Sequence, residues 1–382
     1  MTKNNSKLNI CVFCGARPNF IKVAPIVRLL DKMQTEGKEK ENMSCSMVYA
    51  GREDDPTLED QLFSDLSIRR PDAFLGVECK NLNELTGQVM AKFESYLQNH
   101  PTNVVIVVDD LASTMAAAIV TKKQALTLVH LAAGTRSFDI TMPKEINRLV
   151  IDGLSDILFT AGLSNNSIAN KEGAELSKVY MVGNILIDNI RFNRERMAKL
   201  DIHKMLAFEK LGLSPKNYLV FTLNRQALIN DDANLLAMLK SLLKKASQIT
   251  IVAPLRKMAA EKVITLIREN QLKTDNLHII NPLGYLEFGT LLANAKGVIT
   301  DSGNVAEEAT FDNVPCITLN RYTEHIETVK NGTNVLVGED ATELGRFLDD
   351  MLADKWKAAS IPDRWDGRSA ERIVQILIEH CS

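Results

Sequence analysis

Short apolar runs alternate with segments of helical periodicity through most of the chain. The apolar runs have the length of buried strands, and they occupy residues 8–14, 44–50, 103–108, 126–131, 157–160, 179–182, 218–223, 248–252, 277–280, 297–300 and 316–319. Several place Val, Ile and Leu on consecutive positions, which is typical of parallel strands buried on both faces. The alternation predicts a doubly wound α/β fold.

Helices are predicted between these runs, where apolar residues recur at helical spacing. The predicted helices are residues 21–33, 82–97, 112–120, 146–154, 233–246, 258–269, 285–295, 305–311, 344–352 and 370–379. The pattern becomes polar and helical over residues 191–214, which we interpret as a connection between two halves. Because 382 residues exceed one usual domain, we expect two Rossmann-like domains. They are residues 1–190 and 191–365, with a last helix at about residues 366–382 packing back on the first.

The composition is that of a soluble globular protein, with 45% apolar residues, 24% charged residues and a net charge of −3. Lys and Arg are spread along the chain, so neither a nucleic-acid surface nor a membrane surface is expected. No apolar run approaches the roughly 18 residues that span a bilayer. The polar start leads directly into the first strand, so we expect no signal peptide and a cytoplasmic protein.

Cysteine and histidine give no sign of a metal site. Cys11 and Cys14 form a C-x-x-C motif inside the first predicted strand, where residues i and i+3 face opposite sides. We therefore expect reduced, buried thiols and no redox or zinc pair. His130 ends another predicted strand, and a packed histidine is favoured there over a ligand.

The stretch from residue 297 to 319 reads as strand, turn, helix and strand. Ser302 and Gly303 lie where the turn meets the helix, and the N-terminus of a helix suits a phosphate. Gly303 allows a close backbone approach, and Ser302 offers a hydroxyl. Glu307 and Glu308 lie one turn further and would accept hydrogen bonds from sugar hydroxyls. The alternative is an ordinary helix cap by Ser302.

Charged residues also follow other predicted strands. Arg17 and Lys22 are candidates for an anion contact, with solvated surface charge as the alternative. Asp109 and Asp110 are adjacent, so they either share a proton or form a helix cap with a solvated neighbour. If the carboxyl ends of the two sheets face each other, one cleft receives several of these turns. Those turns are at Arg17, Asp110, Arg136, Arg225 and Ser302.

Several motifs together resemble those of the non-hydrolysing UDP-N-acetylglucosamine 2-epimerases, which have the glycosyltransferase-B (GT-B) fold of two Rossmann-like domains. GARPNFIK at 15–22 and MPKEINR at 142–148 are similar to the family's G-T-R-P-N-F-I-K and M-P-E-E-I-N-R. VGN at 182–184, TDSG at 300–303, GTNV at 332–335, WDG at 365–367 and AERI at 370–373 also recur in the family. The likeness runs nearly end to end, and the motifs are jointly specific.

The resemblance implies a ligand, UDP or a UDP-amino sugar, with no cofactor and no metal. By position, the implied UDP-binding residues are Arg17, Lys22, Arg225, Phe288, Ser302, Gly303, Asn304, Glu308 and Arg321. Phe288 would pack by the uracil, Ser302 and Gly303 would hold the diphosphate, and Glu308 would hold the ribose. Asn304 replaces a usual second glycine and would crowd the phosphate. The family also implies a homodimer and a role in cell-surface polysaccharide biosynthesis.

The catalytic positions depart from the family. Its reaction eliminates UDP and adds it back on the opposite face, using an Asp, two Glu and a His. Asp110 matches the Asp, but the two Glu are Ala132 and Lys144, and the His is Asn224. Glu145, beside the second lost Glu, is retained. Since removing one acid or base group costs about 10²–10⁴-fold in rate, losing three should leave no useful epimerisation.

Three hypotheses follow. The first is a catalytically degenerate paralogue, a pseudoenzyme that binds UDP or a UDP-N-acetylhexosamine as a homodimer or as a partner of an active epimerase. The second is an active UDP-sugar enzyme, either a UDP-GlcNAc/UDP-ManNAc 2-epimerase or a related transferase. Its rewired residues would be Glu53, Asp109, Asp110, Lys144 and Glu145. The third is an assembly role without nucleotide binding, suggested by Asn304 and by EHI at 324–326, where the family has E-R-P.

Overall fold

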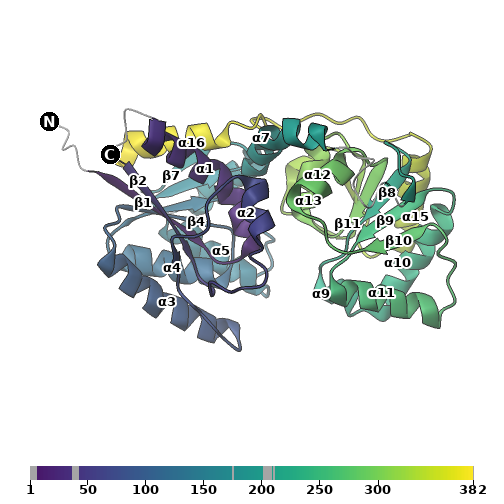
Figure 1. The fold of residues 1–382 in the computed structure, drawn as a ribbon, viewed down its shortest axis with the longest axis horizontal. Coiled ribbons are helices and arrows are strands. Elements are labelled where there is room, and N and C mark those ends of the chain that lie inside the picture. The colour runs from purple at the N-terminus through teal and green to yellow at the C-terminus, as the bar shows by residue number, and fades with distance from the viewer. Residues whose placement is uncertain (1–6, 37–42, 174–175, 201–208, 210, 382) are drawn as a thin grey trace. The chain divides into compact units, whose positions relative to one another are not determined.

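The computed structural model describes residues 7–36, 43–173, 176–200, 209 and 211–381. The chain divides into two compact units, which are coloured in chain order in Figure 1. Unit 1 comprises residues 1–191 and 363–382, and unit 2 comprises residues 192–362. The division falls within helix α7 (Ile185–Lys199). Most of the predicted connection beyond α7, at residues 201–208 and 210, lies outside the described residues.

Unit 1 is built on a seven-stranded parallel sheet with the order β3-β2-β1-β4-β5-β6-β7. The strands are β1 (Leu8–Cys14), β2 (Met43–Tyr49), β3 (Ala73–Phe74), β4 (Val104–Val108), β5 (Thr127–Leu131), β6 (Ile157–Thr160) and β7 (Lys178–Met181). All five residues of β4 are buried, as expected for a central strand covered on both faces.

Helices cover both faces of this sheet (Figure 1). Besides α7, they are α1 (Arg17–Glu36), α2 (Asp60–Leu66), α3 (Leu82–Asn99), α4 (Ala112–Lys123), α5 (Pro143–Leu154), α6 (Leu163–Glu172) and α16 (Ser369–Cys381). α4 packs against both α3 and α5, while α1 packs against α16. Three successive alanines, residues 116–118, let α4 lie close to the strands in the buried core.

The C-terminal helix belongs to unit 1 because buried polar groups fasten it there. The Asp188 carboxylate on α7 accepts hydrogen bonds from the backbone N–H groups of Ser369 (3.2 Å) and Ala370 (2.8 Å). Trp365, just before α16, donates its indole N–H to the carbonyl oxygen of Ala161 at 3.2 Å. The first turn of α16 is thereby capped by a side chain from another helix.

Unit 2 is built on a six-stranded parallel sheet with the order β10-β9-β8-β11-β12-β13. The strands are β8 (Tyr218–Phe221), β9 (Thr250–Pro254), β10 (Leu277–Ile280), β11 (Gly297–Thr300), β12 (Cys316–Thr318) and β13 (Asn334–Leu336). The helices are α9 (Gln226–Ile229), α10 (Asp232–Lys245), α11 (Lys257–Glu269), α12 (Tyr285–Ala293), α13 (Gly303–Phe311), α14 (Ile326–Lys330) and α15 (Ala341–Leu352).

Alternation along the strands of unit 2 creates two cores. Leu219 and Phe221 of β8 enter the core under α10, α11 and α15. Tyr218 and Val220, which point the other way, enter the core under α12 and α13. Because helices cover both faces of the sheet, every residue of β8 faces a core, and the strand is apolar throughout.

The parallel α/β architecture confirms the predicted fold class, while several element boundaries were wrong. β9 begins at Thr250 and not at 248, and α1 begins at Arg17 and not at 21. The Asn19 side chain accepts the backbone N–H groups of Gly15 (2.8 Å) and Ala16 (3.1 Å), which orders the turn before α1. Helices α2 and α6 and the short strands β3 and β13 were not predicted.

The prediction that Cys11 and Cys14 are buried is confirmed. Cys11 and Cys14 are free and fully buried in β1, and burial raises the pKa of both thiols. A thiol with a raised pKa is a poor nucleophile and a poor metal ligand at neutral pH. Among the described residues, no group of three or more His, Cys, Asp or Glu side chains is placed to hold a metal ion.

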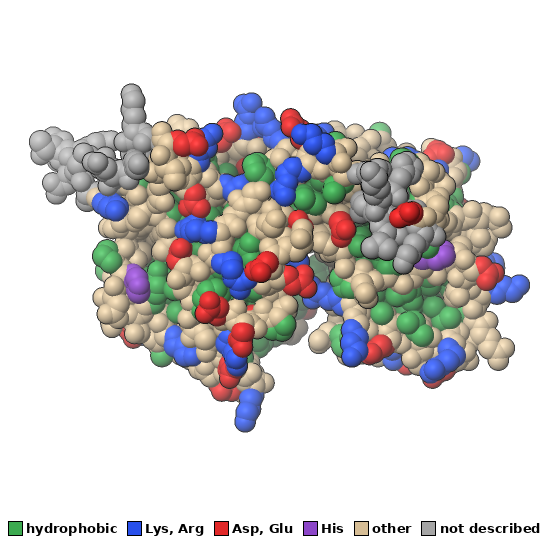
Figure 2. All heavy atoms as spheres, in the orientation of Figure 1, with side chains coloured by type: hydrophobic (Ala, Val, Ile, Leu, Met, Phe, Trp, Pro, Cys, Tyr) green, Lys and Arg blue, Asp and Glu red, His purple; other side chains and the backbone are tan. Residues whose placement is uncertain are grey.

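Charge is evenly mixed on the surface. Figure 2 shows Lys, Arg, Asp and Glu side chains interspersed over the visible face of each unit, in line with the net charge of −3. None of the described helices combines the length and the apolar character needed to cross a bilayer.

Gly183 provides a test of how unit 1 holds its C-terminal segment. Its φ is +100°, and a Cβ there would lie 2.1 Å from the carbonyl oxygen of Arg364. We expect Gly183→Ala to lower the free energy of unfolding by about 3 kcal/mol, since backbone must move. Gly153→Ala, in α5 with no atom within 4 Å of the new Cβ, should instead raise it by roughly 0.5–1 kcal/mol. Urea unfolding followed by circular dichroism measures both, and equal midpoints for the two variants would contradict this packing.

Candidate functional site

In unit 1, polar side chains gather where β1, β4 and β5 end. Arg17 opens α1, and Lys22 lies one turn further on the same helix. The Lys22 ammonium, whose side chain is 10% exposed, lies 2.5 Å from the carboxylate of Asp109, just after β4. Asn19 donates to the other Asp109 oxygen at 3.0 Å. Lys22 is therefore not a solvated surface charge, because it is largely buried and pairs with the partly buried Asp109 carboxylate.

Asp110 is bound to a different set of cations. Arg148 on α5 donates to it through Nε (2.9 Å) and Nη2 (2.5 Å), and the Lys144 ammonium lies 3.4 Å from its other oxygen. Burial alone raises the pKa of Asp110, but Lys144 and Arg148 outweigh burial, so the pKa lies below its ordinary value. The hypothesis that Asp109 and Asp110 share a proton is therefore wrong, because each carboxylate has its own cation.

Glu145 is retained from the family pattern, but its carboxylate is already occupied. It accepts hydrogen bonds from the Ser137 backbone N–H and hydroxyl (2.9 Å each), the Phe138 N–H (3.1 Å) and the Arg148 guanidinium (3.0 Å). Burial opposes ionisation, yet these donors hold the pKa of Glu145 below its ordinary value. Its neighbour Lys144 is 59% exposed and is the accessible cation of the cluster.

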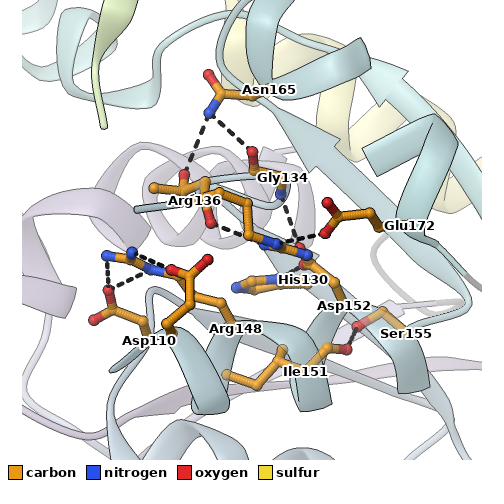
Figure 3. A network of polar contacts seen from close by, with 12 residues as sticks. Asp110, His130, Gly134, Arg136, Arg148, Ile151, Asp152, Ser155, Asn165 and Glu172 are labelled. Carbon is orange, nitrogen blue, oxygen red and sulfur yellow. Dashed lines mark hydrogen bonds and ion pairs between the residues drawn. The ribbon is translucent and has the colours of Figure 1, made fainter. Parts of the chain in front are cut away.

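A buried ion-pair network lies beneath this cluster (Figure 3). The Asp152 carboxylate on α5 lies 2.6 Å from His130 Nδ1 and 2.7 Å from the Arg136 guanidinium, and it accepts the Gly134 N–H at 3.1 Å. His130 Nε2 lies 3.0 Å from the carbonyl oxygen of Asp109. Since a carbonyl oxygen can only accept, Nε2 donates to it, while Nδ1 faces the Asp152 carboxylate. His130 is thus a packed histidine, as the sequence predicted.

Three residues near this network have a strained backbone. Ala132, Asp109 and Phe138 adopt positive φ values of 69°, 60° and 60°. Such values cost L-residues free energy and persist only where surrounding contacts enforce them, commonly at functional sites. Ala132, a predicted catalytic position, therefore has an unusual backbone conformation and a side chain with no acid or base group.

In unit 2, Ser302 and Gly303 form the junction between β11 and α13, as predicted. Ser302 is the N-cap residue by backbone geometry, but its side chain makes no capping hydrogen bond to α13. The alternative of an ordinary side-chain cap is therefore wrong. Gly303 is the first helical residue, followed by the partly buried Asn304. A Cβ on Gly303 would meet the ring of His325 at 2.5 Å, so this turn requires glycine.

Asp301 joins two loops at this edge of the sheet. Its side chain is buried, with 4% of the residue exposed, and one oxygen accepts the N–H groups of Asn224 (2.8 Å) and Arg225 (2.7 Å). The Arg225 guanidinium donates to the side chain of Asn320, after β12. Asn224, where the sequence resemblance predicted a catalytic histidine in the family, is exposed at this edge.

The remaining predicted nucleotide contacts lie around the same edge. Phe288 on α12 is partly buried and packs on the core beneath α13. Arg321 is exposed and lines a cavity of about 510 Å³ together with Gly338 and Asp340. Phe288 belongs to a helix and not to a strand-end turn, so only the resemblance pointed to it.

The two adjacent glutamates of α13 have different surroundings. Glu307 is buried, and its carboxylate lies 2.9 Å from His325 Nδ1. Glu308 is partly buried, and burial, together with the charges of Asp312 and Glu307, raises its pKa to about 8. At neutral pH the Glu308 carboxyl group is therefore mostly protonated, which suits a site where ligand hydroxyl groups replace water.

Sequence reasoning did not assign roles to Arg148, Asp152 or His325. Glu145 and Arg148 are three residues apart on one helix, a spacing that places them on the same face, so this pair was detectable. Asp152 was not, because its partner His130 comes from another element 22 residues away. The pairing of His325 with Glu307 depends on tertiary packing alone.

The raised pKa of Glu308 has a measurable consequence. The folded protein keeps a proton that the unfolded chain loses above about pH 4.5, so stability falls as pH rises until about pH 8. We expect Glu308→Gln to remove roughly 1–2 kcal/mol of this decline between about pH 5 and pH 8, read from thermal unfolding without ligand. The exposed Glu269→Gln variant is the control. An unchanged decline in Glu308→Gln would show that Glu308 does not titrate in this way.

The chain is similar to characterised proteins along nearly its full length. The family profile described as UDP-N-acetylglucosamine 2-epimerase matches residues 35–378. The UDP-N-acetylglucosamine 2-epimerase of Methanocaldococcus jannaschii is 31% identical over 376 residues, which cover 97% of this chain and 99% of that protein. The UDP-2,3-diacetamido-2,3-dideoxy-D-glucuronate 2-epimerase of Pseudomonas aeruginosa is 31% identical over 355 residues, with 90% and 94% covered.

Solved structures agree with this assignment. A crystal structure of the Methanocaldococcus jannaschii enzyme in complex with UDP-GlcNAc and UDP superposes with a TM-score of 0.83 at 30% identity, covering 97% of this chain and 100% of that one. The two parallel-sheet units are those of the GT-B fold, as the motifs predicted. The chain belongs to the UDP-N-acetylglucosamine 2-epimerase family.

Proposed function

We propose that this protein binds UDP or a UDP-N-acetylhexosamine and does not epimerise it. One observation carries the proposal. At the three positions where the family motifs have Glu, Glu and His, this chain has Ala132, Lys144 and Asn224. The phosphate turn at Ser302 and Gly303 is retained.

The remaining acidic groups are poorly suited to proton transfer. Elimination of UDP requires one group to remove the proton from the epimerised carbon and others to support the departing diphosphate. Asp110 is fixed as a carboxylate by Arg148 and Lys144, and its lowered pKa makes it a weak base. The Glu145 carboxylate already accepts four hydrogen bonds from neighbouring groups. Neither group can replace the two missing glutamates.

Retention of a nucleotide is supported by unit 2. The first N–H groups of α13 have no partner within their helix, and the helix dipole favours an anion there. The Ser302 hydroxyl does not cap the helix. A relative 30% identical in sequence was crystallised with UDP-GlcNAc and UDP, so the same ligand class is proposed here. An assembly role, as a homodimer or beside an active relative, is compatible with such binding.

The second candidate is an active enzyme that uses Lys144. The observation in its favour is that Lys144 is exposed beside Asp110 at the edge where the family motif has a catalytic glutamate. A lysine can act as a base when its surroundings favour the neutral amine. If Lys144 is catalytic, the parent protein turns over a UDP-sugar and Lys144→Ala abolishes that turnover. If the protein has lost epimerisation, neither the parent nor Lys144→Ala shows turnover.

Nucleotide binding can be tested by calorimetric titration of the full chain with UDP. We expect saturable binding, weakened at least about tenfold by Gly303→Ala, because the added methyl group enters the phosphate turn and meets the His325 ring at 2.5 Å. Gly87→Ala, on α3 with open space around the new Cβ, should bind as the parent does. Absence of saturable heat with the parent protein would overturn the proposal.

Restoring the family residues tests the loss of catalysis. The variant Ala132→Glu/Lys144→Glu/Asn224→His should convert UDP-GlcNAc to UDP-ManNAc at least about 10²-fold faster than the parent, with little gain from any single change. Adding Asp110→Asn to the triple variant should abolish the gain. A parent protein as active as the restored variant would contradict the degenerate reading.

A further inference from the structure

The imidazole of His325 lies over the first turn of α13. Its Nδ1 is 2.9 Å from the carboxylate of Glu307 on the second turn. Its opposite edge faces the α-carbon of Gly303, since an ideal Cβ there would lie 2.5 Å from both Nε2 and Cδ2. The ring therefore spans from a buried carboxylate to the turn where the diphosphate is proposed to bind.

The position of this ring is fixed by several contacts. The His325 N–H donates to the Thr323 hydroxyl at 3.0 Å. The His325 carbonyl oxygen accepts from Thr328 through its N–H (3.0 Å) and its hydroxyl (2.7 Å). The side chain of Glu307 is only 4% exposed, whereas that of His325 is 21% exposed. The backbone of His325 is therefore fixed by its loop, and its ring pairs with Glu307 while the side chain stays partly exposed.

The charge of the ring decides what Nε2 offers to an anion. In the neutral ring, the proton is held at Nδ1 by the Glu307 carboxylate, so Nε2 presents a lone pair. A lone pair repels a phosphate oxygen. In the protonated ring, Nδ1 donates to Glu307 and Nε2 donates toward the turn, which is the geometry of a charge-assisted hydrogen bond to a phosphate.

We propose that His325 is a diphosphate-binding residue and that nucleotide binding therefore takes up a proton on its ring. The inference rests on the proposed function, because it requires a nucleoside diphosphate at Ser302 and Gly303. The family motif E-R-P has an arginine at this position, and here it reads Glu324-His325-Ile326. A permanent cation has been exchanged for one that titrates near neutral pH.

Other titratable and charged groups surround this turn and are part of the proton balance. They are Asp301 after β11, Glu307 and Glu308 on α13, Glu287 on α12, Arg321 and Glu324 before His325, and Glu327 and Lys330 on α14. Glu308 has the opposite sign, because a Glu308 carboxylate that accepts ribose hydroxyl groups must first release its proton. The protons taken up by His325 are therefore measured as the difference in proton uptake between the parent and a His325 variant, and not from the total uptake of the parent.

The test is titration calorimetry of the full chain with UDP-GlcNAc at about pH 7.5, in buffers of different ionisation enthalpy. UDP-GlcNAc is suitable because its diphosphate is a diester that does not titrate near neutrality. The dependence of the observed heat on buffer enthalpy gives the protons taken up. We expect the parent to take up at least about half a proton more than His325→Gln, which keeps a neutral N–H donor. The affinity of the parent should fall by up to about tenfold per pH unit in alkaline buffer.

His325→Arg is the second variant, and it should bind UDP-GlcNAc with an affinity that hardly changes with pH. Equal proton uptake in the parent and His325→Gln, with binding retained, would overturn the role of His325 and leave the proposed function standing. Absence of saturable heat in all three proteins would overturn both. A circular dichroism spectrum of each variant shows whether it folds. If one of the two variants fails to fold, the comparison of the parent with the other variant tests the role of His325.

Discussion

Backbone N–H groups at the carboxyl ends of parallel strands must find partners outside the sheet, and both units are organised by how this constraint is met. In unit 1 the buried carboxylates of Asp152 and Glu145 accept such groups from the loop after β5. In unit 2 Asp301 accepts those of Asn224 and Arg225. Each carboxylate fixes a loop next to a helix N-terminus, so a site edge is rigid before any ligand binds.

If the protein has lost epimerisation as we propose, these loop contacts explain how its binding loops can persist without the catalytic residues. The contacts that set the backbone after β5 involve His130, Arg136 and Asp152, and none of them involves the side chain of Ala132. Ala132 lies in this loop in the left-handed conformation, at a free-energy cost of about 1–2 kcal/mol.

The sequence predicted the architecture because the strands carry strong local patterns. The fully apolar β4 and the alternation along β8 each indicate a sheet covered on both faces. The short edge strands β3 and β13 carry too few apolar residues for such a pattern. Asp301 and the turn at Ser302 were found as a motif, yet the sequence did not show that the Ser302 hydroxyl leaves its helix uncapped.

Charge partners were harder to predict than the sites themselves. Asp109 and Asp110 are adjacent in the chain, which suggested a shared proton. Their side chains diverge, so that Lys22 pairs with one and Arg148 with the other. The adjacent Glu307 and Glu308 diverge in the same way, since neighbouring helical residues point in different directions. Such divergence follows from backbone geometry, but the identity of each partner depends on elements that are distant in the sequence.

The central claim is that the protein keeps a nucleotide-sugar site and has lost epimerisation. The most direct test is proton NMR of UDP-GlcNAc with the purified full chain in heavy water, following the anomeric signals and the proton at C2. The account predicts line broadening of the uracil signals, with no new UDP-ManNAc signals and no deuterium at C2. Deuterium exchange at C2, or the appearance of UDP-ManNAc, would contradict it.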